Sequence, residues 1–317
     1  MTLTSVVATF STSAVANSKT VTIVSATLSG TKASNYSLTL VGAPTTTANI
    51  TQKTLTIGGS FAVSNKQYDG SDSATISSNS LTLLTKVGSE TVTLASVTAS
   101  FSSGTVADGK TVSITAGTLG GANAGNYTLS LTGAPTTTAN ISQKTLTIGG
   151  SFTVSTKEYD GLTSASIATN SLTLVTKVGS DDVSLTSVVV AFATADAASG
   201  KTVSISSASL TGAKSANYSL SLTGAPTTTA TISQKELTIG GSFTASDKEY
   251  NGSASASIAT NSLTLVTKVG SDDVSLTSVV VAFDNATAGS GKTVSISSAS
   301  LTGAKSANYT LSLTGAP

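Results

Sequence analysis

Cysteine, histidine and tryptophan are all absent from this 317-residue chain. Thiolate and imidazole metal ligands, the commonest general base and every Ser-His or Cys-His nucleophile pair are therefore missing. The sequence also lacks a glycine-rich phosphate loop and a convincing pair of catalytic carboxylates. We therefore expect the protein not to be an enzyme and to need no cofactor.

Charge is scarce as well, since only 10% of the residues are charged and the formal net charge is +1. Without a basic stripe the chain offers no binding site for nucleic-acid phosphates. No apolar run approaches the roughly 18–20 residues of a membrane span, which argues against membrane insertion of this segment. The mean hydropathy is nevertheless positive, at +0.25, so we expect the chain to fold rather than to be disordered.

The few aromatic residues reveal an internal repeat. Tyr127 follows Tyr36 by 91 residues, and every tyrosine, phenylalanine and proline belongs to a series with this same step. A unit of 91 residues is too long for one coil of a solenoid and suits a small sandwich domain with its own core. We therefore expect separate domains arranged like beads on a string.

The ends of the chain fall out of phase with this repeat. If each unit begins at the glutamine of the QKTLTI or QKELTI segment, residues 1–51 form a C-terminal half-unit. Residues 52–142 and 143–233 are then full repeats, and residues 234–317 form a repeat that lacks its last strand. Unpaired strand edges are templates for pairing, so self-association by strand pairing is an alternative that the sequence leaves open.

Short runs of alternating apolar and Ser/Thr residues fill each unit and predict about seven strands. In residues 143–233, Gly149-Gly150 predicts a tight hairpin turn between two strands. A change of parity between Leu185 and Val188 predicts a β-bulge. The expected fold is all-β, a tandem array of immunoglobulin-like antiparallel β-sandwich repeats.

The segments KQYDG, KEYDG and KEYNG, together with an NYSL or NYTL segment before each GAP, carry a family resemblance. They resemble the YDG-type repeat domains of large bacterial surface and secreted proteins, the filamentous-haemagglutinin-like adhesins. The resemblance implies extracellular spacer units without catalytic residues. The motif residues are Tyr68, Asp69, Gly70, Tyr159, Asp160, Gly161, Tyr250, Asn251, Gly252, Asn126, Tyr127, Asn217 and Tyr218.

Residue chemistry suggests a simple role for these motifs. Asp-Gly and Asn-Gly pairs both form tight turns, so Asn251 retains a turn role although it carries no carboxylate. Each tyrosine stands beside turn residues, and we expect a half-buried ring whose hydroxyl binds loop backbone. Stacking of these rings on a glycan is the alternative.

Two cross-linking chemistries are also conceivable. Clustered carboxylates could bind calcium to stiffen the array, with Asp160, Asp181, Asp182, Asp272 and Asp273 as the candidate ligands. A Lys-Asn isopeptide bond could join Lys53, Lys144, Lys235, Lys110, Lys201 or Lys292 to Asn126, Asn217 or Asn308. No acid that would promote such a bond is evident from the sequence.

Two functions fit this pattern. The first is a structural spacer or stalk of a bacterial extracellular adhesin or surface filament. Neighbouring repeats are then the partners, and the number of repeats sets the length of the stalk. The second is an adhesive module that binds a glycan or a host or cell-surface protein, with repetition adding avidity. The uniform 91-residue step without a chemically distinct copy favours the spacer.

Overall fold

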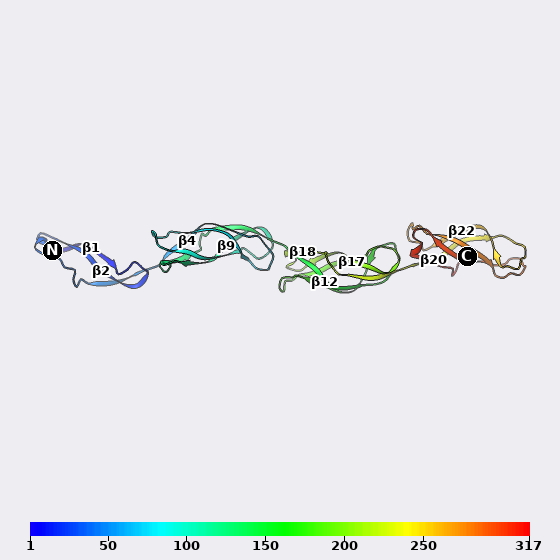
Figure 1. Cartoon of the computed structure of the whole chain (residues 1–317), viewed down its shortest axis with the longest axis horizontal. Helices are drawn as coiled ribbons and strands as arrows, with labels where there is room; N and C mark the ends of the chain where they lie inside the picture. The colour runs from blue at the N-terminus through cyan, green and yellow to red at the C-terminus, as the bar shows by residue number, and fades with distance from the viewer. The chain divides into compact units, whose positions relative to one another are not determined.

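A computed structural model describes residues 1–317 and contains strands and four short 3-10 helices. The chain divides into two compact units, Met1–Lys144 and Thr145–Pro317, each described below by itself. No helix in it has both the length and the apolar character that a membrane span requires. The prediction of an all-β protein is confirmed (Figure 1).

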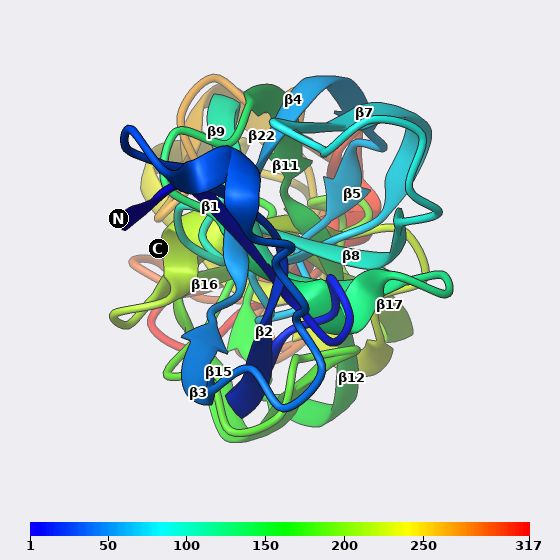
Figure 2. The same ribbon diagram turned by 90° about the vertical axis from the view of Figure 1, so that its left-hand side faces the viewer.

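The first unit contains three sheets. Residues 1–51 form an antiparallel sheet of β1 (Thr2–Phe10), β2 (Ala16–Ser29) and β3 (Thr45–Ile50). The next repeat has a three-stranded sheet of β10 (Tyr127–Ser130), β4 (Lys53–Val63) and β7 (Ile76–Leu84). Its five-stranded sheet has the order β5 (Lys66–Gln67), β11 (Thr136–Ser142), β9 (Ala107–Gly120), β8 (Thr93–Phe101) and β6 (Ser73–Ala74). The 3-10 helices of this unit are η1 (Ala33–Asn35) and η2 (Ala124–Asn126). Figure 2 shows β4 and β7 side by side, as their antiparallel pairing requires.

The second unit repeats this plan. One three-stranded sheet has the order β15 (Ile167–Val175), β12 (Lys144–Val154) and β18 (Tyr218–Ser221). The five-stranded sheet has the order β13 (Lys157–Glu158), β19 (Thr227–Ser233), β17 (Ala198–Thr211), β16 (Ser184–Phe192) and β14 (Ser164–Ala165). The last repeat has the sheets β22 (Ile258–Val266), β20 (Lys235–Ala245), β25 (Tyr309–Ser312) and β21 (Ser255–Ala256), β23 (Ser275–Phe283), β24 (Val294–Thr302). The 3-10 helices are η3 (Ser215–Asn217) and η4 (Ser306–Asn308).

Within one repeat, side chains from both sheets form a common core. Apolar residues at alternate positions of β12 face those of β16, β17 and β19, because successive side chains of a strand point to opposite faces. The buried members are Ile148, Phe152, Val190, Phe192, Val203, Ile205 and Ile232. Most strand pairs are antiparallel, but β20 and β25 of the last repeat pair in parallel, as β4 and β10 do in residues 52–142. The short β13 also pairs with β19 in parallel.

The predicted hairpin turn at Gly149-Gly150 is wrong. β12 runs without interruption through both glycines, and Gly150 pairs with Leu172 of β15. Gly150 has a φ of +80°, and a Cβ added there would lie 2.2 Å from the backbone oxygen of Ser171. The glycine therefore allows two backbones to approach closely inside the sheet. A glycine pair in a sequence can indicate such an approach as readily as a turn.

The predicted bulge after Leu185 is confirmed. The pairing of β16 with β17 shifts its register between Thr186 and Val189 and again between Val189 and Val190. Ser187 lies within this irregularity and has a φ of 50°. The extra residue reverses the side-chain parity, so that Leu185 and Val190 can both pack against the same core.

The expectation of separate beads is also wrong for residues 145–317. One core cluster contains residues of both repeats, since Phe152 and Tyr159 of the first belong to it together with Leu237, Val274 and Tyr309 of the second. Every strand from β12 to β25 pairs only with strands in this same range. Within this unit the two repeats are therefore coupled through shared apolar contacts rather than through a bare linker.

The outer edges of the sheets have features that oppose pairing. β13 and β14, each of two residues, are the edges of the five-stranded sheet. On the edge strand β15, the side chain of Asn170 accepts a hydrogen bond from the amide of Leu172 at 3.0 Å. Short edge strands and occupied edge amides work against pairing with another chain. Self-association by strand pairing stays a prediction.

Candidate functional site

The KEYDG segment forms a tight, internally bonded turn. The Asp160 carboxylate accepts a hydrogen bond from the amide of Leu162 at 2.9 Å and pairs with Lys157 at 2.7 Å. The same Lys157 ammonium donates to the carbonyl of Leu162 and lies 5.9 Å from the centre of the Phe192 ring. Gly161 has a φ of +77°, which glycine adopts without steric cost. These bonds fix the direction in which the neighbouring Tyr159 projects.

Tyr159 projects into the following repeat. Its side chain is 2% exposed, and its hydroxyl donates to Oδ2 of Asp272 at 2.9 Å. Tyr309 donates to the same oxygen at 2.6 Å, and its ring packs edge-on against that of Tyr159 with the centroids 5.3 Å apart. A Cβ on Gly161 would lie 3.2 Å from the side chain of Val269. The YDG motif is thus the contact surface between two repeats.

A second group of contacts lies beside the tyrosines. Asn308, which is 3% exposed, accepts from the amide of Ala197 at 2.7 Å and donates to Asp196 at 3.0 Å. Asp196 also pairs with Lys305 at 2.8 Å. These two bonds, led by that of Lys305, hold the pKa of Asp196 below its ordinary value. A separate ion pair joins Glu158 to Lys235 at 2.6 Å.

Burial and the shared carboxylate change the acidity of the two tyrosines. Desolvation, followed by the hydrogen bond to Asp272, raises the pKa of both Tyr159 and Tyr309 to about 12. Between pH 10 and pH 12 the unfolded chain therefore binds fewer protons than the folded one, so stability falls as the pH rises. We expect the unfolding free energy of residues 145–317 to decline over this range. Urea unfolding at stepped pH measures the decline, and it should be smaller in Tyr159→Phe; an equal decline would contradict the assignment.

The copies of the motif differ in a way that tests its role. Tyr250, the third YDG-type tyrosine, is 70% exposed, whereas Tyr159 is buried. Asn251 keeps the turn, since its side-chain oxygen accepts from the amide of Ser253 at 3.1 Å. The remaining motif tyrosines Tyr68, Tyr127 and Tyr218 are buried, Gly70 and Gly252 have φ values of +81° and +77°, and Asn217 is 5% exposed.

The turn role of the motif carboxylate gives a testable contrast. We expect Asp160→Ala to lower the unfolding free energy by about 1 kcal/mol, because the amide of Leu162 loses its acceptor. Asp160→Asn should cost less, because an asparagine makes the equivalent bond at position 251. Urea denaturation of the single variants measures both. Equal losses for alanine and asparagine would show that the negative charge, rather than the turn, matters.

The calcium candidates are engaged in protein contacts. The structure contains no group of three or more acidic, histidine or cysteine side chains that could hold a metal ion. Asp181 accepts from the hydroxyl of Tyr218 at 2.6 Å, as Asp272 does from Tyr309. Asp182 and Asp273 accept hydrogen bonds from the amides of Ala213 and Ala304, both at 2.9 Å. Asp69 and Asp160 each form an ion pair with the lysine three residues earlier.

Several of the residues considered for an isopeptide bond have other partners. Asn308 binds Asp196 and Ala197, and Asn126 accepts from the amide of Val15 at 2.9 Å. Lys235 pairs with Glu158. The remaining lysines with described partners donate within their own repeats: Lys110 to Ser103, Lys201 to Thr194, and Lys292 to Thr287.

Sequence reasoning missed the residues that receive Tyr159. Asp272 was assigned to calcium, and Asp196 and Lys305 were not singled out at all. A signal was available for the first, because an acidic residue recurs at this position as Glu90, Asp181 and Asp272. No such signal exists for Asp196, since the equivalent positions hold Thr105 and Thr287.

Comparisons with known proteins address the family. The model of the YDG domain matches three stretches, residues 51–139, 142–230 and 233–316. No curated protein and no solved structure matches the chain. The three matches together cover far more than half of its length. The chain therefore belongs to the YDG domain family, as a tandem array of three such domains.

Proposed function

We propose that this chain is a structural spacer, a stalk whose repeats are locked to one another. One observation carries the proposal: Tyr159 of one repeat is buried in the next, where it shares the Asp272 carboxylate with Tyr309. The buried rings, the charged pairs and the shared core all resist bending at the joint.

The chemistry of the chain supports a mechanical rather than a catalytic role. Side chains that could do chemistry at the joint are used in pairing: the Asp272 carboxylate binds two tyrosines, and Asp196 binds a lysine and an amide. We place the stalk at the bacterial surface or in the extracellular space as part of an adhesin. The resemblance of the repeats to those of giant bacterial surface proteins supports that placement.

A distance measurement across the joint tests the stalk. The chain has no cysteine, so Ala168→Cys and Ala259→Cys, at equivalent exposed positions of two repeats, can be spin-labelled selectively. Pulsed electron paramagnetic resonance should give one narrow distribution of the distance between the two spin labels. Adding Tyr159→Ala should broaden it, whereas Tyr250→Ala should not. A distribution that is already broad without Tyr159→Ala would exclude a stiff joint.

A binding module is the second candidate, supported by a groove that recurs in two repeats. Residues Asn170, Leu172, Thr173, Leu174, Lys177, Val183, Ser184 and Leu185 line a hollow of about 460 Å³. Their equivalents, which include Leu263, Leu265 and Lys268, line one of about 430 Å³ in the next repeat. No aromatic ring lines either groove, so neither groove offers a ring for stacking on a glycan. Screening the full chain on a glycan array tests this alternative, and specific binding would favour it over the spacer.

A further inference from the structure

The chain begins and ends the repeat of residues 52–142 at opposite ends of its strands. Gln52 directly precedes β4, and Ser142 is the last residue of β11. β4 has 11 residues, so at roughly 3.3 Å per residue it is about 35 Å long. Ser142 pairs with Gln67, a few residues past the far end of β4. Tension applied to the two ends of this repeat therefore acts along the strands.

A parallel neighbour holds the first strand of this repeat. β4 pairs in parallel with all four residues of β10. Side chains add to the pairing, because the carboxamide of Gln52 donates to the carbonyls of Gly125 at 3.0 Å and Tyr127 at 3.2 Å. The hydroxyls of Thr54 and Thr128 form a further bond of 3.2 Å across the two strands. The start of β4 is thus bonded to β10 by both backbone and side chains.

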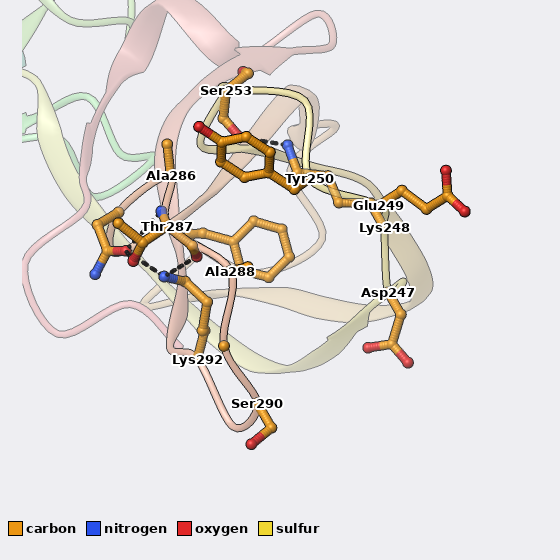
Figure 3. A pocket seen from close by; sticks show the side chains of 13 residues that line it. Asp247, Lys248, Glu249, Tyr250, Ser253, Ala286, Thr287, Ala288, Ser290 and Lys292 are labelled. Carbon is orange, nitrogen blue, oxygen red and sulfur yellow. Dashed lines mark hydrogen bonds between the residues drawn. The ribbon is translucent and has the colours of Figure 1, made fainter.

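The last strand of the repeat has a parallel neighbour as well. The last two residues of β11 pair with both residues of β5. The Lys66 side chain anchors the short β5, because its ammonium donates to the carbonyl of Ser71 at 2.7 Å and lies 5.7 Å from the centre of the Phe101 ring of β8. Figure 3 shows the equivalent lysine of the last repeat, Lys248, which donates in the same way to the carbonyl of Ser253. The anchor is therefore a recurring feature.

Both parallel pairs recur in the second unit. β20 and β25 pair in parallel, and the carboxamide of Gln234 donates to the carbonyls of Ala307 at 2.9 Å and Tyr309 at 3.2 Å. β13 and β19 also pair in parallel, and the amide of Tyr159 donates to the carbonyl of Ser233 at 2.9 Å. The glutamine that opens each QKTLTI or QKELTI segment thus bonds the same two carbonyl positions in residues 52–142 and 234–317.

The direction of the force decides how strongly a strand pair resists it. The hydrogen bonds of a sheet run across from strand to strand, so a force along the strands loads all bonds of a pair at the same time. When two adjacent strand ends are pulled apart, the bonds instead break one after another. Forced unfolding is governed by the unfolding rate. The simultaneous loading of several bonds lowers this rate, because they must break in one step.

We infer that the two parallel strand pairs are mechanical clamps, which allow a repeat to bear tension between its ends without unfolding. The N-terminal clamp consists of β4 and β10 with the side chain of Gln52, and the C-terminal clamp consists of β11 and β5. The inference rests on the proposed stalk function for the source of the tension. It does not depend on the joint at Tyr159, because both clamps lie within one repeat.

Single-molecule pulling on the full chain in two directions tests the clamps. The chain has no cysteine, so introduced cysteines define the points of attachment. Thr51→Cys with Ser142→Cys applies the force along the strands and loads both clamps. Thr51→Cys with Lys86→Cys pulls apart the adjacent ends of β4 and β7, whose antiparallel register pairs Thr56 with Leu84. At the same constant force, the first pair of attachment points should give an unfolding rate at least about tenfold lower than the second.

Alanine variants, pulled along the strands, compare bonds inside and outside the N-terminal clamp. Gln52→Ala removes two hydrogen bonds and should raise the unfolding rate about tenfold, and Thr54→Ala should raise it less. Thr98→Ala is the matched control, because it removes a hydroxyl contact with Thr115 on the antiparallel pair β8 and β9, and it should leave the rate unchanged. Equal rates in the two pulling directions, or no effect of Gln52→Ala, would overturn the inference. A flexible joint would appear in the spin-label distances and leave these rates unaffected.

Discussion

Tyr159→Ala is expected to lower the unfolding free energy of residues 145–317 by about 3–5 kcal/mol, the usual cost of removing a buried aromatic ring. The ring is 2% exposed and packs against Tyr309, and its hydroxyl binds Asp272. The substitution therefore leaves a cavity in the joint and one acceptor bond unmade. Urea or thermal unfolding measures the loss, and the two repeats should then unfold in separate steps, because the contact that couples them is gone.

Two companion variants separate the contributions to this effect. Tyr159→Phe keeps the ring and removes only the hydroxyl, so it should cost about 1 kcal/mol. Tyr250→Ala makes the same chemical change at an equivalent tyrosine that is 70% exposed, and it should cost under about 0.5 kcal/mol. If Tyr159→Ala were as mild as Tyr250→Ala, the rings would not stabilise the joint, and the stalk proposal would lose its main support.

Gly150→Ala is expected to lower stability by about 3 kcal/mol or more, a size typical of strain at a special backbone position. The added methyl group would meet the backbone oxygen of Ser171 at 2.2 Å, and backbone cannot move aside as a flexible side chain can. The φ of +80° adds the ordinary cost of a left-handed conformation, about 1–2 kcal/mol. Thermal unfolding measures the total effect.

Gly224→Ala is the matched control for this substitution. Gly224 has a nearly identical φ of +73°, but a Cβ there would meet no atom within 4 Å. Gly224→Ala should therefore lower the unfolding free energy only by the cost of the left-handed backbone conformation, about 1–2 kcal/mol. Equal losses at the two positions would mean that the close approach to Ser171 contributes nothing and that the strand bends to accept the methyl group.

The turn chemistry of the motif could be predicted from local sequence. Asp-Gly and Asn-Gly pairs favour a tight turn wherever they occur, because the preference lies in the backbone of two residues. The structure has Asp160 and Asn251 accepting the amide two residues ahead, by the same bond. The same local reasoning failed at Gly149-Gly150. A glycine pair permits either a turn or a close strand approach, and only the neighbouring strand β15 decides between them.

The sequence alone determined the 91-residue period, the all-β class and the family, because alternation and repetition are properties of the chain taken in order. Only the tertiary structure decided what the motif is for. Tyr159 lies 113 residues before Asp272 and 150 before Tyr309, and no local pattern relates residues so far apart. These residues meet only because one repeat packs on the next. The packing makes the turn motif part of the joint between the two repeats.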